Sequence, residues 1–186
     1  MQSEINKLYK QIQKILIDLI PEKWNSIYLY ASIGNRKKGE MFFYYFPKRI
    51  IKTKPINGYE IARKFDLDEA KYNAKLEEIY EYIKRLNLIA KRSWTNLTIS
   101  IKDDIFMVEY HYNNIENSRY TDSQRHTVWC FKYLNEPIES MNNEDRILVR
   151  SYKEESVIKP TIYTEKMNAD ENVEDSKQIR NQILKC

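Results

Sequence analysis

Glycine is scarce in this sequence, which has only Gly34, Gly39 and Gly58 among its 186 residues. Loops that cradle phosphate groups need several glycines at fixed short spacings, and these three fit none of the nucleotide-binding patterns. Histidine is scarcer still, because His111 and His126 are the only two and lie on different predicted elements. The sequence therefore argues against a nucleotide cofactor and against a histidine-based metal centre.

Cysteine is also rare, and Cys130 and Cys186 alone make neither a disulfide framework nor a zinc site. Cys130 follows His126 by four residues, so the two would share one face of a helix and could form a nucleophile and its base. A cysteine between aromatic residues is more often buried and inert. We therefore expect no catalytic residues, no metal and no cofactor.

Long apolar runs are absent too, because no stretch approaches the roughly 20 apolar residues of a membrane-spanning helix. The first 21 residues intersperse Lys7, Lys10 and Lys14 among their apolar positions, so they lack the continuous apolar core of a secretion signal. These absences predict a cytoplasmic protein that does not bind membranes.

Tyrosine is abundant, with 15 residues in a chain that is 42% hydrophobic and 31% charged. This composition is typical of one soluble folded domain. Tyrosine combines an apolar ring with a polar tip, which suits a half-exposed sheet face or a binding surface. Residues 1–100 carry a net charge of +8 and residues 101–186 one of −4. The asymmetry is compatible with a charged partner and also with an ordinary solvated surface.

Hydrophobic periodicity predicts helices and hairpins in alternation. Apolar residues at three- and four-residue spacing indicate helices, and alternation of apolar and polar residues indicates strands. The sequence predicts an α+β fold of one domain, an antiparallel β-sheet of two hairpins packed with three to four helices in the order helix-hairpin-helix-hairpin-helix. The expected elements are a helix over 5–19, a hairpin of 27–33 with 41–46, a helix over 66–89, a hairpin of 94–101 with 105–112, and helices over 121–134 and 143–152.

Two of the predicted helices have further local signals. Asp66 stands three residues before Glu69, which favours a capped start for the longest helix. The helix that begins at Thr121 or Asp122 has apolar residues at helical spacing near its end. These residues, Val128, Phe131 and Leu134, are expected to point inward.

The remaining segments are less regular. Residues 47–59 contain two prolines, a glycine and four basic residues, and we expect a loop or a ragged edge strand there. In the second hairpin, Phe106, Val108 and Tyr110 fall on one face of a strand and the intervening residues on the other. Residues 156–186 are polar and mostly aperiodic. We therefore expect a domain over 1–155 and a tail that is flexible or ordered by a partner.

A basic turn beside exposed aromatic residues, within residues 35–49, offers one hypothesis for function. Such a surface could bind phosphate groups and stack bases. The same lysines could instead form a solvated turn that keeps an edge strand from aggregating. The candidate nucleic-acid-binding residues are Arg36, Lys37, Lys38, Tyr44, Lys48 and Arg49.

Five segments of the chain resemble, in order, the YezG-like (EsaG-like) immunity proteins of low-G+C bacteria. No single segment is diagnostic, but all five are in register, and together they cover roughly residues 3–140. The segments are IPEKWNSIYLYA (20–31), FFYYF (42–46), SWTNLTISI (93–101), FMVEYHY (106–112) and SQRHTVWCFKYL (123–134).

The resemblance implies a cytosolic antitoxin without an active site of its own. Its partner would be the C-terminal nuclease domain of a toxin exported by a type VII secretion system. An inhibitor of a nuclease is expected to offer carboxylates to a cationic groove, which makes the acidic second hairpin the candidate partner surface. The alternative is a small nucleic-acid-binding protein that uses the basic aromatic hairpin. The candidate partner-binding residues are Asp103, Asp104, Glu109, Tyr110, Tyr112 and Glu116.

Under the same resemblance, four residues are expected to be structural: Trp24, Trp94, Asn96 and Trp129. Trp94 would seal the corner where the long helix meets the sheet, and Asn96 would satisfy backbone groups there.

Three features depart from the family as we expect it. Lys91 and Arg92 precede Trp94 where related proteins tend to be acidic, residues 48–54 are more basic than expected of a nuclease inhibitor, and the tail after about residue 155 is additional. These departures concern which toxin is bound rather than the class of protein.

Overall fold

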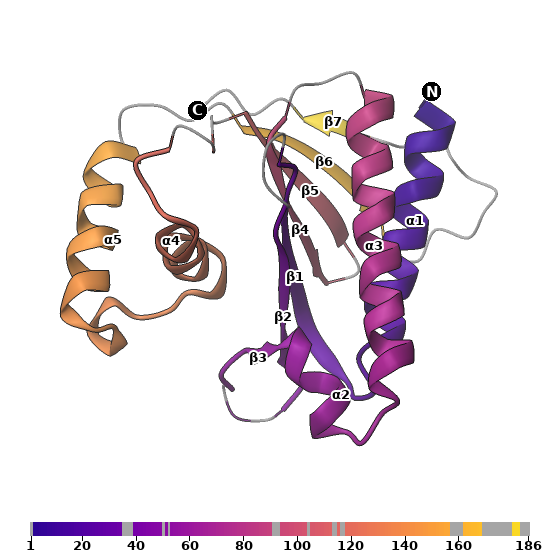
Figure 1. The fold of residues 1–186 in the computed structure, drawn as a ribbon, viewed down its shortest axis with the longest axis horizontal. Coiled ribbons are helices and arrows are strands. Elements are labelled where there is room, and N and C mark those ends of the chain that lie inside the picture. The colour runs from indigo at the N-terminus through magenta and orange to yellow at the C-terminus, as the bar shows by residue number, and fades with distance from the viewer. Residues whose placement is uncertain are drawn as a thin grey trace.

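A seven-stranded antiparallel sheet forms the centre of the fold, with its strands in the order β3-β2-β1-β4-β5-β6-β7 (Figure 1). The computed structural model describes the backbone of residues 2–34, 39–49, 51, 53–90, 94–103, 105–112, 115, 118–156, 162–168 and 180–182, and the side chains of these apart from residues 90, 155–156, 162–168 and 180–182. Among the described residues, no helix combines the length and apolar character needed to cross a membrane.

The α+β fold of one domain is confirmed, and the predicted order of helices and hairpins holds approximately, because α2, β6 and β7 were not predicted. The helices are α1 (Gln2–Asp18), α2 (Ile61–Lys64), α3 (Glu69–Ala90), α4 (Asp122–Leu134) and α5 (Asn143–Ser156), with 3-10 turns η1 (Gly58–Glu60) and η2 (Ile138–Ser140). The strands are β1 (Trp24–Ser32), β2 (Met41–Pro47), β3 (Ile56–Asn57), β4 (Asn96–Lys102), β5 (Ile105–His111), β6 (Ile162–Asn168) and β7 (Arg180–Gln182).

Strand β1 joins the two predicted hairpins into one sheet. On one side it pairs with β2, where Ile27 lies opposite Tyr45, and on the other with β4, where Ile27 lies opposite Ile101. Each hairpin follows from local alternation, but their pairing connects strands that are far apart in the sequence. Local periodicity does not encode such a contact.

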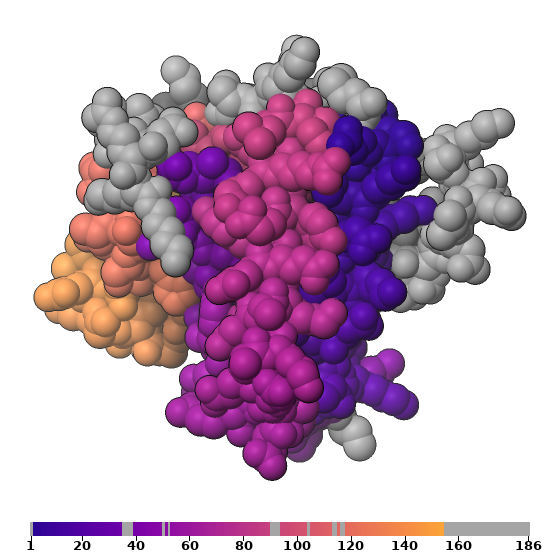
Figure 2. Space-filling model, turned by 45° about the vertical axis from the view of Figure 1, so that its right-hand side comes forward, coloured from indigo at the N-terminus to yellow at the C-terminus, as the bar shows by residue number. Residues whose placement is uncertain are grey.

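Helices α1 and α3 cover one face of the sheet and enclose the main core. Figure 2 shows the two helices side by side at the surface. Ile27 and Leu29 of β1 point into this core, as do Phe106, Val108 and Tyr110 of β5, and all five side chains are buried. The predicted two faces of β5 are therefore confirmed. Burial of aliphatic and aromatic side chains of this size supplies most of the folding free energy.

Helix α4 covers the opposite face of the sheet, and α5 packs on the outer side of α4 (Figure 1). Leu134 of α4 is buried as predicted, together with Trp129 and Cys130, whereas Val128 and Phe131 are only half-buried. The Nζ of Lys153 in α5 lies 5.7 Å from the centroid of the Phe131 ring. Because α4 is contacted from two sides, one apolar stripe does not identify its sheet-facing side.

The start of α3 is capped by Asp68 rather than by Asp66. The carboxylate Oδ1 of Asp68 accepts a hydrogen bond of 3.0 Å from the backbone N–H of Lys71, and this bond lowers the pKa of Asp68. Asp66 instead has a φ of 52°, in the left-handed region that aspartate tolerates better than most residues. The prediction placed the cap two residues too early.

The irregular segment after β2 forms a minimal edge of the sheet. β3 contributes only two residues, which pair with Tyr44 and Tyr45 of β2, as expected of a ragged edge strand. Gly58 follows directly, and a Cβ at this position would lie 2.0 Å from the ring of Phe43. Only glycine allows the backbone to approach the ring this closely.

The C-terminal residues add two strands to the other edge of the sheet. β6 pairs with β5, and β7 pairs with β6. The sequence predicts a tail that is flexible or ordered by a partner, and the described parts of this tail are strands of the chain's own sheet. The remainder of the tail lies outside the described residues.

Trp94 lies at the corner between α3 and β4 and is 2% exposed. Its ring is 5.3 Å from that of Tyr110, and its carbonyl oxygen accepts a 3.0 Å hydrogen bond from Asn87 Nδ2. Asn96 donates instead to the Thr95 hydroxyl, at 3.1 Å. Asn96 was expected to satisfy backbone groups at this corner, and the backbone carbonyl of Trp94 is satisfied by Asn87. Trp24 is half-buried against the same core.

Replacing Trp94 by alanine should destabilise the fold by about 3–5 kcal/mol, the usual loss for a buried large aromatic residue. Within the described residues, the indole Nε1 has no hydrogen-bond partner, so Trp94→Phe should cost clearly less. Urea unfolding monitored by circular dichroism measures both variants. An unchanged midpoint for Trp94→Ala would show that the ring does not support the core.

Candidate functional site

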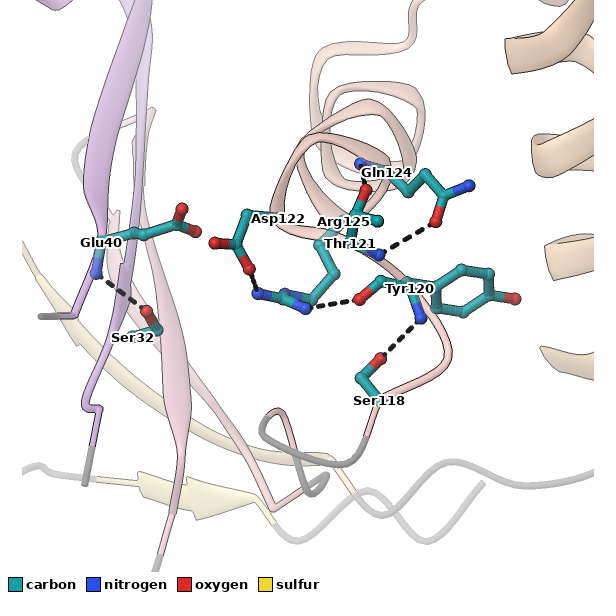
Figure 3. A network of polar contacts seen from close by, with 8 residues as sticks. All are labelled: Ser32, Glu40, Ser118, Tyr120, Thr121, Asp122, Gln124 and Arg125. Carbon is teal, nitrogen blue, oxygen red and sulfur yellow. Dashed lines mark hydrogen bonds and ion pairs between the residues drawn. The ribbon is translucent and has the colours of Figure 1, made fainter. Parts of the chain in front are cut away.

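A polar network fixes the start of α4 beside the first hairpin (Figure 3). Thr121 caps the helix, because its hydroxyl accepts from the backbone N–H of Gln124 and the Gln124 side chain accepts from the backbone N–H of Thr121. Arg125 forms an ion pair with Asp122 and donates to the carbonyl oxygen of Tyr120 at 2.7 Å. The sequence predicts a cap at Thr121 or Asp122, and the structure shows that Thr121 is the cap and that Gln124 completes a capping box.

Two carboxylates meet at this network. Figure 3 shows the Glu40 and Asp122 side chains facing each other, with Arg125 next to Asp122. Burial raises the pKa of Glu40, and the Asp122 carboxylate raises it further, while Arg125 lowers it. Glu40 itself is held by its backbone N–H, which donates to Ser32 Oγ at 3.0 Å. Glu40, which lies between β1 and β2, thus couples the turn of the first hairpin electrostatically to the start of α4.

Aromatic rings fill the space between α4 and the sheet. The centroid of the Trp129 ring lies 5.0 Å from that of Phe42 and 6.3 Å from that of Tyr30, both in edge-on geometry. The indole Nε1 of Trp129 donates a buried hydrogen bond of 3.0 Å to Thr98 Oγ1 of β4. Trp129 is buried in this layer, and the hydrogen bond of its polar atom links α4 to β4.

A second polar cluster lies under the C-terminal half of α4. Tyr133 Oη donates to Glu109 Oε2 at 2.6 Å, and Lys132 Nζ lies 3.5 Å from the same carboxylate oxygen. His111 Nε2 is 3.4 Å from the Tyr133 hydroxyl. Burial lowers the pKa of His111 to about 4, and the Lys132 ammonium contributes in the same direction. The imidazole is therefore neutral at pH 7.

The histidine and cysteine that could have formed a catalytic pair do meet, but in an unreactive setting. Cys130 Sγ lies 3.5 Å from His126 Nε2, and the same nitrogen is 2.9 Å from the hydroxyl of Tyr44. Burial raises the pKa of the Cys130 thiol to about 12, so the thiolate that a nucleophile requires is not populated at neutral pH. Among the described residues, no three His, Cys, Asp or Glu side chains come together in a group that could hold a metal ion.

The candidate partner-binding residues do not form one surface. Tyr110 is buried in the main core against Trp94 and also contacts the Tyr9 hydroxyl. Glu109 lies on the other face, under α4. Asp103 is exposed in the β4–β5 turn, and Tyr112 is half-buried beyond the far end of β5. Tyr112 packs against the same core as Tyr110, whereas Glu109 and Asp103 lie elsewhere. Asp104 and Glu116 lie outside the described residues.

The candidate nucleic-acid-binding residues are also separated. The ring of Tyr44 is stacked on His126 with centroids 5.9 Å apart. Arg49 is within 3.7 Å of Glu22, and Lys48 is exposed beside it. The other three residues, Arg36, Lys37 and Lys38, lie outside the described residues.

Sequence reasoning missed the polar cluster of Tyr133, Glu109 and His111. A signal for it existed, because Trp129 and Tyr133 are four residues apart on one helix face and both carry a polar atom that needs a partner when buried. The face of β5 that carries Glu109 and His111 supplies the polar partners of Tyr133. The local sequence does not show that α4 lies over this face.

Hydrogen bonds and aromatic contacts between α4 and the strands of the sheet define this junction. The chain belongs to the YezG-like family of immunity proteins, whose family model matches residues 5–148. The immunity protein YezG of Bacillus spizizenii (strain ATCC 23059 / NRRL B-14472 / W23) is 28% identical over 136 residues, covering 70% of this chain and 83% of that protein. The immunity protein YezG of Bacillus subtilis (strain 168) is 27% identical over 150 residues, covering 78% of this chain and 96% of that protein. Family membership supports an immunity role, which implies a cognate toxin as partner.

The hydrogen bond between Trp129 and Thr98 should contribute measurably to stability. Thr98→Val keeps the shape of the side chain but leaves the buried indole N–H without its partner, which should cost about 1–3 kcal/mol. In a Trp129→Phe background the same substitution should cost much less, because no N–H remains to be satisfied. Denaturant unfolding of the two single variants and the double variant gives the coupling energy. If the stability losses of the two single variants add up fully in the double variant, the hydrogen bond does not contribute to stability.

Buried His111 should make stability depend on pH. An unfolded histidine titrates near pH 6.5, whereas the pKa of folded His111 is about 4, so between these values the unfolded chain binds the additional proton. Stability should therefore fall as the pH falls from about 6.5 to about 4, by up to roughly 3 kcal/mol from this residue. His111→Gln should flatten this dependence in urea midpoints measured across the range. A constant difference between the variant and the natural protein at every pH would contradict the assignment.

Proposed function

We propose that this protein is a cytoplasmic antitoxin that binds the C-terminal nuclease domain of a type VII-secreted toxin and keeps it inactive in the producing cell. The observation that carries the proposal is the family match over residues 5–148, which spans the two hairpins, α3 and α4. The described residues support a mechanism without chemistry of its own, because His111, His126 and Cys130 serve packing. Inhibition then rests on occupying the toxin.

We assign the toxin-binding role to the tip of the second hairpin. The Asp103 side chain is 79% exposed in the β4–β5 turn, with a φ of 50°, and the neighbouring Ile105 is 43% exposed. The tip thus presents an apolar side chain together with a carboxylate, whose Oδ2 lies 3.9 Å from the Lys102 ammonium. Tight interfaces combine buried apolar anchors with complementary charge. Glu109 and Tyr110, by contrast, are already used inside the fold.

A carboxylate at this tip suits the chemistry of a nuclease. An enzyme that binds a polyanionic backbone needs a cationic or metal-lined groove, and an acidic turn competes for the same groove. An antidote must also suppress leaked toxin at low concentration. We therefore expect nanomolar or tighter affinity, which corresponds to roughly 12 kcal/mol of binding free energy or more.

Direct binding of nucleic acid by this chain has no observation in its favour among the described residues. Base stacking needs an accessible aromatic face, and the Tyr44 ring lies against His126. The Arg49 guanidinium has Glu22 as a neighbour, which reduces its attraction for phosphate. We expect DNA to be retained by the isolated protein no better than by a neutral protein at physiological salt.

The proposal predicts a tight complex with the nuclease domain of the cognate toxin, weakened by Asp103→Lys. Isothermal titration calorimetry should show nanomolar binding by the natural protein and a loss of roughly tenfold or more in the variant, about 1.4 kcal/mol. The loss should shrink at high salt because the contact is electrostatic. Glu77→Lys, on an exposed position of α3, makes the same charge change and should bind normally.

Two results would count against different parts of the proposal. A folded natural protein that neither binds nor inhibits the nuclease would overturn the antitoxin function. Tight binding that Asp103→Lys leaves unaltered would keep the function and move the interface away from the hairpin tip.

A further inference from the structure

The outer edge of β5 is covered along its whole length by the chain's own C-terminal strand. Every residue of β5, from Ile105 to His111, has a partner in β6, from Asn168 back to Ile162. Without β6, the outward N–H and C=O groups of a regular seven-residue strand would be open to pairing with another chain.

The opposite edge of the sheet is protected by simpler means. β3 is two residues long, and Pro47 at the end of β2 offers no N–H donor. The hydroxyl of Tyr59 donates to the carbonyl oxygen of Met41 at 2.8 Å, which occupies one more edge group of β2. Strand β5 is seven residues long and contains no proline. Protection of its edge therefore depends on the C-terminal segment, defined here as residues 162–168 and 180–182.

This C-terminal segment lies beyond the family core. The family match ends at residue 148, within α5. The alignment with the Bacillus subtilis relative uses 96% of that protein but only 78% of this chain. The C-terminal segment is therefore outside the region that the family model matches.

Strand β5 is complementary to itself. In an antiparallel pair centred on Val108, that residue lies opposite Val108 of a second copy, and Phe106 lies opposite Tyr110. On the other face Met107 lies opposite Glu109, and the terminal residues of the strand pair with each other. The buried face gains apolar and aromatic pairs, and neither face sets like charges against each other. A two-fold axis through Val108 satisfies the symmetry of an isologous dimer.

We propose that the C-terminal segment keeps this protein monomeric by covering the β5 edge, and that the partner this edge fits is β5 of a second copy of the chain. Release of the segment exposes the edge and converts the monomer into a two-fold dimer with one continuous sheet. This edge shares Ile105 with the hairpin tip assigned to the toxin, but the proposal does not depend on the identity of the toxin.

Proline substitution in β6 tests the proposal in the full-length chain. Successive residues of a strand direct their N–H groups to opposite neighbours, so Thr164→Pro with Glu165→Pro removes one donor toward β5 whichever residue faces it. The matched control, Thr164→Ala with Glu165→Ala, removes the same side chains and keeps both donors. In analytical ultracentrifugation, the proline variant should dimerise with a dissociation constant lower by roughly tenfold or more than that of the control.

A substitution in β5 distinguishes the proposed dimer from unspecific association. Met107 lies opposite Lys166 in the chain itself and opposite Glu109 of the second copy in the dimer. Met107→Glu should leave the otherwise natural chain monomeric, because β6 still covers the edge. Added to the proline variant, it should weaken dimerisation by roughly tenfold or more.

Each alternative result overturns the proposal. A proline variant that melts like its control and sediments as a monomer shows that the covered edge does not self-associate. Association that Met107→Glu leaves unchanged shows a different contact. If the proline variant does not fold, the chain ending at Ser156 replaces it. The proposal is contradicted if this shortened chain folds and stays monomeric. It is also contradicted if the shortened chain cannot fold, because the segment would then be a necessary part of the fold and not a removable cover.

Discussion

Strand β1 imposes the constraint on which the rest of the structure depends, because it is paired along both edges and buried on both faces. Leu29 and Ala31 point into the core under α1 and α3, while Tyr30 points toward α4. Two-stranded hairpins are marginal in isolation. The pairing of β1 with β4 gives both hairpins a common sheet, and this sheet offers two faces that different helices can cover.

The abundance of tyrosine finds its explanation in these faces. On the α4 side, aromatic rings fill the layer and their polar tips find partners, as Tyr44 does with His126 and Tyr133 with Glu109. On the other side, the hydroxyl of Tyr110 meets that of Tyr9 within the core. An aliphatic layer would bury similar area without specifying a position, whereas satisfied polar tips fix where α4 rests. The same contacts remove Glu109 and Tyr110 from the surface that a partner can reach.

Sequence reasoning reached those parts of the fold that local patterns encode. Periodicity identifies α1 and α3, and alternation identifies the buried face of β5 from Phe106 to Tyr110. It misses the pairing of β1 with β4, because that contact is set by the packing of distant segments rather than by either strand alone. It also misses β6, whose sequence IYTEKMN has two successive charges and resembles a loop until β5 supplies an edge.

The candidate site was predictable only in part, for the same reason. Acidic and aromatic residues close together in the second hairpin suggested one surface, but alternate residues of a strand point to opposite faces. Glu109 and Tyr110 are neighbours in sequence and are separated by the sheet. Asp103 escapes this division because it lies in the turn, where no helix covers it.

We propose that this protein acts by occupying its partner, without chemistry of its own. Titration of the protein into a fixed amount of the nuclease domain proposed for the cognate toxin, with DNA cleavage as the readout, tests this proposal most directly. The account predicts that cleavage falls in proportion to added protein and ends at one equivalent, with the protein recovered intact in the complex. Cleavage that persists beyond several equivalents of folded protein, or that is suppressed by far less than one equivalent, would contradict it.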